Sequence, residues 1–328
     1  MTSPRTQRSR RPRPIDQREM LHQLNQRYYQ QWHRAERLER ELARVRGRLL
    51  GPLFAWLLAL KRRFIPLPQH AAETTLPTGT PLAEPTQTPA GTLSIIIPFK
   101  DNVDLLRACL RSLRRTTRDG VEFVLVDTGS QDPRTARYLA RLQLRPNVRL
   151  VACPGPFNFS RACNLGASQA TGDFFLFLNN DTEALAPDWR DRMLRLLADP
   201  TVGVVGGLLL YPDHTIQHAG IFPDDQGRWV HVGRTQSPDS LTQPMIVPAV
   251  SGACLLLRRA DFTSVAGFDE TLPLTYNDVD LCRRLADRGL RTALAPAARF
   301  FHYEGLTRGF SGDQPGADHL HDLTAFPA

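Results

Sequence analysis

The chain has 328 residues, about the length of two domains or of one large domain with appendages, and 41% of them are hydrophobic, enough for one substantial core. Its formal net charge is +8, but residues 1–63 carry 16 Lys/Arg and 5 Asp/Glu, whereas the rest carries 25 and 28. Because the body is slightly acidic, we expect no nucleic acid among its partners, although the basic N-terminal segment could touch any polyanion.

The five cysteines predict buried free thiols in a reducing compartment. They are Cys109, Cys153, Cys163, Cys254 and Cys282; each lies in apolar sequence, and no two form a C-x-x-C pair. The first 30 residues contain Arg but no apolar segment of the kind found in a secretory signal peptide. We therefore expect a cytoplasmic protein.

Residues 1–14 are rich in Arg, Pro, Ser and Thr and predict a disordered basic arm, and residues 15–63 predict a helical segment. Within this segment apolar side chains recur at heptad positions. One set is Leu21, Tyr28, Ala35, Leu42 and Leu49, and the companion set is Leu24, Leu38 and Val45. Two interpretations stay open: a coiled coil that forms a homo-oligomer through residues 15–50, or a single amphipathic helix that lies on the body or on a membrane.

An apolar run from Leu49 to Leu60 is followed by three basic residues at 61–63. It is shorter than the roughly 20 residues that cross a bilayer. It can lie among the headgroups of an anionic leaflet, which would place the protein peripherally on the inner face of the cell membrane, or it can pack against the body. Residues 64–92 contain six prolines and no periodic pattern, and predict an extended Pro-rich linker.

Residues 93–305 predict a globular α/β domain, and residues 306–328 a loose C-terminal tail. Apolar runs of strand length alternate with segments of helical spacing, which indicates a mostly parallel central sheet flanked by helices. The expected strands are 94–98, 121–126, 148–152, 174–178, 202–211, 253–257 and 272–276; the expected helices are 103–115, 133–142, 159–170 and 278–289.

Acidic side chains follow four of these strands, at Asp101, Asp127, Asp181 and Asp278. Since ligands gather at the carboxyl ends of strands in open α/β sheets, we expect one common crevice. Asp181 follows two asparagines at the end of an apolar run, and this segment is either an ordinary turn or a tether for a metal–diphosphate. The body lacks G-x-G-x-x-G and G-x-x-x-x-G-K-[ST], so bound phosphates would need a cation, which Asp181 can hold.

Six segments from Leu93 to Glu304 resemble, in order, family 2 glycosyltransferases, and most of all the bacterial rhamnosyltransferase-type members. The segments are LSIIIPFKD, FVLVDTGSQDP, GPFNFSRACNLGASQATGDFFLFLNNDTE, VGVVGGLLLYPDHTIQHAG, VSGACLLLRRADFTSVAGFDE and NDVDLCRRLADRG. The resemblance implies a glycosyltransferase-A fold, a nucleotide-sugar donor, a Mg²⁺ or Mn²⁺ ion, and inversion at the anomeric carbon. It also implies a glycan or lipid-linked acceptor in cell-surface polysaccharide synthesis.

The resemblance assigns the donor-binding residues position by position. Pro98, Phe99 and Asp101 would line the nucleotide pocket, and Asp127 would face the base or ribose. Gly252 would let donor or acceptor approach the backbone closely.

The resemblance also assigns the metal and catalytic residues. Asp181 would bind the cation beside the diphosphate, with Asn180 before it, and His302 would complete the metal or diphosphate site. Tyr303 stands where the family often has a second histidine. Asp278 resembles the catalytic base.

The chemistry fits these residue types, because an inverting transfer needs one carboxylate to accept the acceptor's proton and positive charge beside the departing diphosphate. Two other classes remain: a sugar nucleotidyltransferase, which the glycine-free loop PFKDNVD disfavours, and a non-catalytic transferase-like scaffold. Asp278 can also have a purely structural role, as a negative charge that stabilises the N-terminus of a helix. We expect His218 to be structural and His231 to lie on a loop over the acceptor site.

Overall fold

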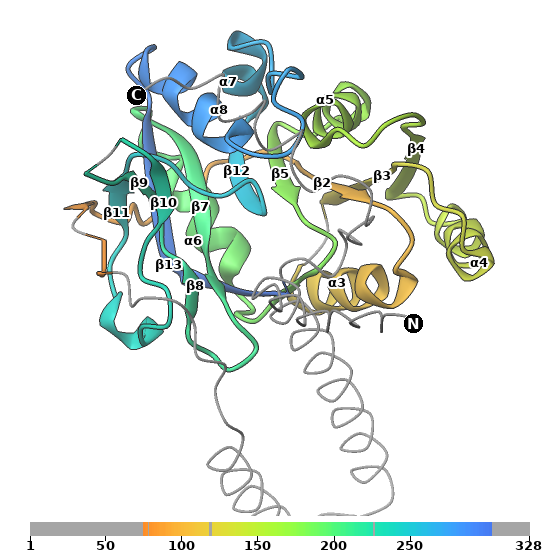
Figure 1. Cartoon of the computed structure of the whole chain (residues 1–328), viewed down its shortest axis with the longest axis horizontal. Helices are drawn as coiled ribbons and strands as arrows, with labels where there is room; N and C mark the ends of the chain where they lie inside the picture. The colour runs from red at the N-terminus through yellow and green to blue at the C-terminus, as the bar shows by residue number, and fades with distance from the viewer. Residues whose placement is uncertain (1–74, 78, 118–119, 226, 304–328) are drawn as a thin grey trace, which may run out of the picture. The chain divides into compact units, whose positions relative to one another are not determined.

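A computed structural model describes residues 75–303 of the chain, except residues 78, 118–119 and 226 (Figure 1). The expected basic arm, the helical segment 15–63 with its oligomer or membrane role, and the tail 306–328 lie outside the described residues. The chain divides into two units, Met1–Gln69 and His70–Ala328, and everything below concerns the second. No helix in the described part is long and apolar enough to cross a membrane.

The first half of the domain alternates strands and helices and forms a parallel sheet. Its elements are β2 (Leu93–Phe99), α3 (Val103–Thr116), β3 (Val121–Asp127), α4 (Pro133–Leu142), β4 (Val148–Ala152), α5 (Phe159–Gln169) and β5 (Phe174–Leu178). β2 pairs in parallel with β3 and β5, and β3 pairs in parallel with β4. Every residue of β2 and β5 is buried, as expected for strands with helices on both faces.

The second half makes the sheet mixed, whereas the sequence predicted a mostly parallel one. Its elements are β6 (Thr182–Ala184), α6 (Trp189–Leu196), β7 (Val202–Leu210), β8 (Ile216–His218), β9 (Ile221–Pro223), β10 (Trp229–His231), η1 (Pro238–Ser240), β11 (Met245–Val247), β12 (Cys254–Arg258), α7 (Arg259–Ser264), α8 (Asn277–Ala286) and β13 (Arg291–His302). β12 runs antiparallel between β5 and β7, and β13 is parallel to β7 but antiparallel to β11 and β6. The strand order is β1-β11-β13-β7-β12-β5-β2-β3-β4.

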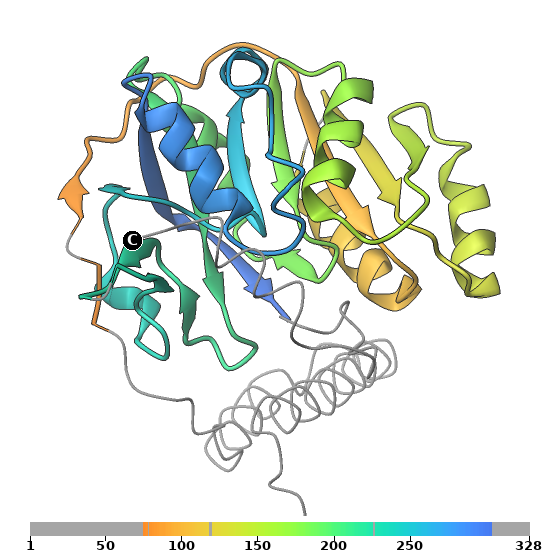
Figure 2. The same cartoon turned by 45° about the horizontal axis from the view of Figure 1, so that its top comes forward.

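Helices cover both faces of the sheet (Figure 2). Alternate side chains of β2 point to opposite faces. Ile95 and Ile97 join the core cluster that includes α3 side chains, whereas Ile96 lies against α5. A Cβ added at Gly166 of α5 would stand 2.5 Å from Ile96 Cγ2, so this helix packs closely on the sheet.

The second half differs from the sequence-based expectation in several elements, since β6, α6, β8, β9, β10, β11 and α7 were not expected. Residues 272–276 form a loop, not the expected strand. β13 was not foreseen, although at 12 residues it is the longest strand described. Its register with β7 shifts between Ala295 and Arg299, around Pro296, because proline cannot donate a ladder hydrogen bond.

Part of the expected linker 64–92 contacts the domain. β1 (Thr80–Pro81) pairs antiparallel with β11, and Leu82 packs against the hydrophobic core. Glu84 forms a 3.4 Å ion pair with Arg195 of α6. Residues 80–84 therefore belong to the edge of the folded domain.

All five cysteines are free and buried, as predicted. Burial raises the pKa of the Cys254 and Cys282 thiols to about 12. Both remain protonated at neutral pH, and their role is packing.

Candidate active site

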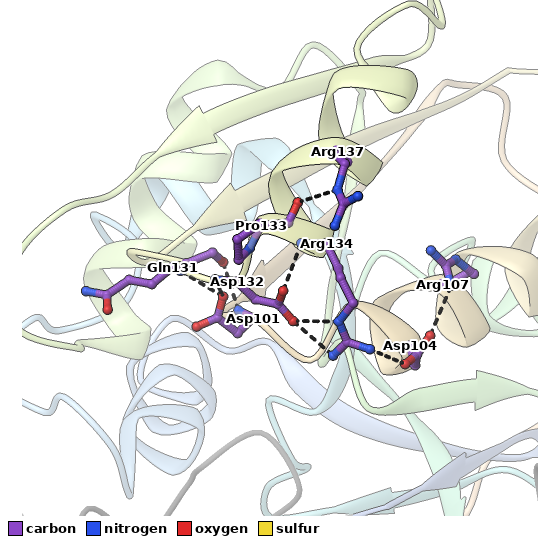
Figure 3. Close-up of polar contacts among 9 residues, drawn as sticks. Asp101, Asp104, Arg107, Gln131, Asp132, Pro133, Arg134 and Arg137 are labelled. Atoms are coloured by element: carbon purple, nitrogen blue, oxygen red, sulfur yellow. Dashed lines mark hydrogen bonds and ion pairs between the residues drawn. The ribbon is translucent and has the colours of Figure 1, made fainter.

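The loops after β2 and β3 are held together by Asp101. Its Oδ1 accepts hydrogen bonds from the backbone N–H groups of Gln131 (2.8 Å) and Asp132 (2.7 Å), and its own N–H donates to Ser130 Oγ (2.8 Å) (Figure 3). Asp101 has a positive φ of 49°, in the left-handed region. Asp101 thus fixes the shape of the corner where the sequence placed the nucleotide pocket.

Asp127 ends β3 in the same corner. Its Oδ1 accepts the N–H groups of Gly129 (3.1 Å) and Ser130 (2.7 Å), and the side chain is only partly buried. Pro98 and Phe99 are buried in β2. A ligand in this corner would therefore meet the two carboxylates and the loop backbone, and not the side chains of Pro98 and Phe99.

The end of β5 meets the end of β13 at Asp181 and His302. Asp181 is 2% exposed, and its Oδ1 lies 3.4 Å from His302 Nε2. The Tyr303 N–H donates to the Asp181 carbonyl at 3.0 Å, and His302 pairs with Thr182 across β6 and β13. Sheet pairing thus unites two residues that the sequence places far apart and for which it predicted a shared metal site.

Gln217 of β8 fixes the orientation of His302. Its Oε1 lies 2.7 Å from His302 Nδ1, and its Nε2 donates to the His302 carbonyl at 3.1 Å. Since an amide oxygen only accepts, Nδ1 carries a proton, and Nε2 faces the Asp181 carboxylate. In the neutral ring Nε2 is an acceptor, which faces the Asp181 carboxylate and also lies 3.3 Å from the Asn179 amide nitrogen, a possible donor to it.

This donor set fits a divalent cation with substrate phosphates as further ligands. A carboxylate oxygen and an imidazole nitrogen are suitable protein ligands, and Mg²⁺ sites often have only one or two protein carboxylates. No third His, Cys, Asp or Glu joins the pair in the described part of the chain. Asn180 Nδ2 is buried beside it and has no hydrogen-bond partner among the described residues, which leaves one donor for an anionic ligand.

Asp278 opens α8 with its carboxylate fixed at both oxygens. Oδ2 accepts the N–H of Gly252 at 2.9 Å, and Oδ1 accepts the N–H of Val279 at 2.9 Å. Tyr276 precedes the helix with a positive φ of 60°, which turns the chain sharply into α8. The half-buried carboxylate is therefore oriented before any substrate arrives.

The loop that delivers Asp278 is held by polar side chains at the start of α5. Asn164 bonds both the N–H and the carbonyl of Phe268, each at 2.9 Å. The Asn158 side chain donates to the Glu270 carbonyl (2.8 Å), and Ser160 Oγ donates to the Leu272 carbonyl (2.6 Å). These bonds support the loop before Asp278, where the sequence predicted a strand at 272–276.

The Asp181–His302 corner and the Asp278 corner adjoin where β5 ends and β12 begins. The Asn179 N–H donates to the Ala253 carbonyl at 3.0 Å, next to Gly252. Strand β8 makes a second connection between these two corners. Its Gln217 contacts His302, and the adjacent His218 accepts the Ser251 N–H at Nε2 (3.1 Å).

His218 is buried, as a structural role requires, and its Nδ1 lies 2.9 Å from Nδ1 of His231. Burial, reinforced by the nearby His231, Arg234 and His302, lowers the pKa of His218 well below its usual value. Since Nε2 accepts the Ser251 N–H, the neutral ring carries its proton on Nδ1 and donates it to His231. Sequence reasoning did not identify Gln217, because a glutamine inside a three-residue strand carries no recognisable signal.

Three comparisons place this site among known proteins. The family model described as glycosyl transferase family 2 matches residues 94–263. The chain is 37% identical over 224 residues to the O-antigen biosynthesis protein RfbC of Myxococcus xanthus, a match that covers 66% of this chain and 18% of that protein.

A second relative is the N-acetylglucosaminyl-diphospho-decaprenol L-rhamnosyltransferase of Mycobacterium tuberculosis. It is 27% identical over 235 residues, which is 62% of this chain and 73% of the relative. The chain therefore covers most of one relative but about a fifth of RfbC.

Among solved structures, GalNAc-T7 with UDP, GalNAc and Mn²⁺ aligns with a TM-score of 0.54 at 18% identity, over 64% of this chain and 43% of that one. That likeness shows a shared fold, the glycosyltransferase-A type expected from the sequence. Together with the family match over residues 94–263, it leads to one conclusion: the chain belongs to glycosyl transferase family 2.

Proposed function

We propose that the protein is an inverting, metal-dependent glycosyltransferase that moves a sugar from a nucleotide-diphosphate donor to a hydroxyl group. The observation that carries this proposal is the junction of β5 and β12. There Asn179, two residues before Asp181, bonds to Ala253, and the neighbouring Gly252 bonds to Asp278. One carboxylate suited to proton transfer thus adjoins another suited to a cation.

Asp278 is the proposed general base. As the acceptor oxygen attacks the anomeric carbon, its proton passes to the Asp278 carboxylate, and the bond from that carbon to the diphosphate oxygen breaks. Attack from the face opposite the leaving group inverts the configuration. The bonds from Gly252 and Val279 hold the carboxylate in one orientation, which limits the reorganisation needed during transfer.

The donor would bind across the ends of β2, β3 and β5. Asp101 and Asp127 would hold the base and ribose, and Asp181 and His302 would hold Mg²⁺ or Mn²⁺ beside the diphosphate. A cation held there supplies positive charge to the departing diphosphate. Asn180 Nδ2 would donate to a phosphate oxygen, which would satisfy its buried hydrogens.

The relatives' names suggest the acceptor. One is named for O-antigen biosynthesis and another for rhamnosyl transfer to a diphospho-decaprenol acceptor. We extend this to a hexosyl or rhamnosyl transfer to a glycan or lipid-linked acceptor in cell-surface polysaccharide synthesis. Residues 15–63 would add an oligomer or membrane contact on the cytoplasmic side.

The test is hydrolysis and transfer assays with UDP-, dTDP- and GDP-sugars, with and without Mn²⁺. We expect one donor class to be consumed in a Mn²⁺-dependent way by the wild type and not by Asp278→Asn. Formation of a nucleotide sugar from a nucleoside triphosphate and a sugar phosphate would instead identify a nucleotidyltransferase. No binding and no turnover of any donor would identify a scaffold.

A further inference from the structure

Two rows of arginines run along neighbouring helices outside the candidate active site. On α3 they lie at helical positions i, i+4, i+7 and i+8, and on and just after α4 at i, i+3, i+7 and i+11, so each row occupies one side of its helix. The first row is Arg107, Arg111, Arg114 and Arg115, and the second is Arg134, Arg137, Arg141 and Arg145. We call this surface the α3–α4 face.

The two rows approach one another at a cleft of about 350 Å³, which Arg107 of the first row lines together with Arg134, Arg137 and Arg141 of the second. The guanidinium of Arg107 lies 4.9 Å from the centre of the Tyr138 ring, which stands between the rows. Burial raises the pKa of Tyr138, and the positive charges of arginines from both rows, among them Arg114 and Arg145, oppose that rise. The rows therefore form one continuous positive surface.

Negative charge balances this surface only at one end. Asp104 pairs with Arg107 (2.9 Å) and Arg134 (3.5 Å), and Asp132 pairs with Arg134 (2.9 Å) (Figure 3). The other six arginines of the two rows have no acidic partner within the described ranges. Those arginines are Arg111, Arg114, Arg115, Arg137, Arg141 and Arg145. Burial, and to a smaller extent the nearby charge of Arg145, lowers the pKa of Arg114.

An exposed leucine lies at the uncompensated end. Leu144, between Arg141 and Arg145, is 86% exposed, more than any other large apolar side chain described. An apolar side chain flanked by cations is suited to the boundary between lipid headgroups and acyl chains. A soluble polyanion would use the arginines but gain nothing from this leucine.

We propose that the α3–α4 face docks on an anionic membrane surface, with its arginines on lipid phosphates and Leu144 inserted at headgroup level. α3 and α4 begin at the sheet edge that carries Asp101 and Asp127. Docking through this face would hold the donor corner near the lipid surface. The inference uses no residue of the N-terminal segment and does not depend on the proposed transfer reaction.

The test is co-sedimentation of the full chain with vesicles of phosphatidylcholine plus phosphatidylglycerol, and with phosphatidylcholine alone. We expect the anionic vesicles to bind in a salt-sensitive way. Each arginine near such a surface contributes about fivefold in affinity, so Arg137→Glu with Arg141→Glu should weaken binding at least roughly 25-fold.

The matched control is Arg259→Glu with Arg288→Glu, two exposed arginines near α7 and α8 whose replacement changes the net charge equally. Equal losses in both variants would show an effect of total charge alone and overturn the proposal, as would no loss in the α4 variant. Leu144→Ser should weaken binding even at high salt, and unchanged binding would overturn its insertion.

RNA added as a competitor tests whether the α3–α4 face binds a soluble polyanion and not a membrane. If RNA displaces the protein from vesicles and binds the wild type but not the α4 variant, while Leu144→Ser changes nothing, the face binds a soluble polyanion and the lipid assignment fails. Transfer to a soluble acceptor should stay unchanged in all these variants, so a failure of docking is distinct from a failure of the proposed activity.

Discussion

The backbone N–H of Gly252 donates a 2.9 Å hydrogen bond to Oδ2 of Asp278, across 26 residues of sequence. Gly252 immediately precedes Ala253, whose carbonyl receives the Asn179 N–H. A single peptide segment therefore connects the proposed base to the strand end that carries Asp181. Any movement of this segment would alter both corners at once.

Replacement of Asp278 by asparagine should abolish sugar transfer and leave the fold and donor binding intact. The amide can still accept one of the two hydrogen bonds, but it cannot accept a proton at neutral pH. We expect a loss of about 10²–10⁴-fold in kcat, which a general base typically contributes. Asp280→Asn is the control, because Asp280 lies on the same helix but pairs with Arg284. A transfer rate near the wild-type value in purified Asp278→Asn would refute the assignment.

Replacement of Gly252 by alanine should impair transfer more than folding. The new Cβ would stand 3.4 Å from Phe159 Cε1 and 3.6 Å from Asp278 Cβ, which are ordinary contacts. It would nevertheless fill space beside the Asp278 carboxylate and displace this group. Because a small displacement of a reacting group slows transfer, we expect kcat/KM to fall by roughly tenfold or more.

Gly206→Ala gives the contrasting result. Its Cβ would stand 2.5 Å from Val250 Cβ, so this variant should lose about 1–3 kcal/mol of stability from overpacking. Thermal melts and steady-state kinetics of both variants separate the two effects. If Gly252→Ala melts as early as Gly206→Ala, the role of Gly252 is packing.

The parallel half of the fold was predictable from sequence almost to the residue. The helix Pro133–Leu142 and the strands Val148–Ala152 and Phe174–Leu178 have the expected bounds. Each of these elements has an apolar run or an apolar stripe, and turn-forming residues mark its ends. Elements that follow one another in this half of the chain also lie close together in the fold. β13 was missed because Pro296 and several alanines interrupt its pattern, and only its partners β7 and β11 define it as a strand.

The sequence proposes residues for the candidate site, whose roles stay predictions, but it gives no sign of how the structure connects them. Asp181 and Asp278 carried a signal because each is a carboxylate at the start of a turn or helix. The contact between Gln217 and His302 spans 85 residues and depends on the pairing of β7 with both β8 and β13. No pattern in the sequence around either residue predicts such a contact.

Replacement of Gln217 by leucine should raise the Mn²⁺ concentration needed for half-maximal activity by about 10–100-fold, the usual effect of losing a hydrogen bond behind a metal-binding histidine. Leucine removes the acceptor of the His302 Nδ1 proton and frees the ring to rotate. Gln217→Glu keeps an acceptor and should lie closer to the wild type. Mn²⁺ titrations of donor hydrolysis measure the difference, with Asp181→Ala as the reference for a lost ligand. An identical Mn²⁺ dependence in all four proteins would place the cation elsewhere.

Acidification should destabilise the domain through His218. Burial, with the charges of His231, Arg234 and His302, lowers the pKa of His218 well below 6.5 in the folded state. The unfolded chain therefore binds one more proton between its own pKa, near 6.5, and the folded pKa. Stability from this group is complete above about pH 6.5 and falls with decreasing pH, by up to about 1.4 kcal/mol per pH unit.

Denaturant unfolding of the wild type and His218→Gln at several pH values below neutrality tests this dependence. The variant should be less stable at neutral pH, because glutamine replaces the ring that accepts the Ser251 N–H. It should also lose less stability on acidification. If the difference between the two proteins does not change with pH, His218 does not titrate as argued.

The folded domain should begin near Thr75, so a chain shortened to start at Thr92 should be less stable than one that starts at Thr75. The longer chain keeps the pairing of Thr80 with Ile246, the bond from the Leu82 N–H to the Pro244 carbonyl (2.8 Å), and the packing of Leu82 on the core. Removing them exposes the edge of β11 and part of the core. We expect a loss of about 2 kcal/mol, mostly from the burial of Leu82.

Thermal melts of the two shortened chains measure this loss. For a domain of this size, about 2 kcal/mol corresponds to a Tm lower by roughly 4–8 °C in the chain that starts at Thr92. Leu82→Ser in the longer chain is the matched variant and should account for most of the difference, since a 3.4 Å ion pair such as the partly exposed Glu84–Arg195 pair contributes about 1 kcal/mol. Donor binding should survive in both chains, because β11 pairs with β13 only at Thr292–Leu294, at the other end of that strand from His302, and β2 and β3 lie at the opposite end of the sheet order. Equal Tm values would mean that residues 75–91 rest on the domain without stabilising it, as a linker would.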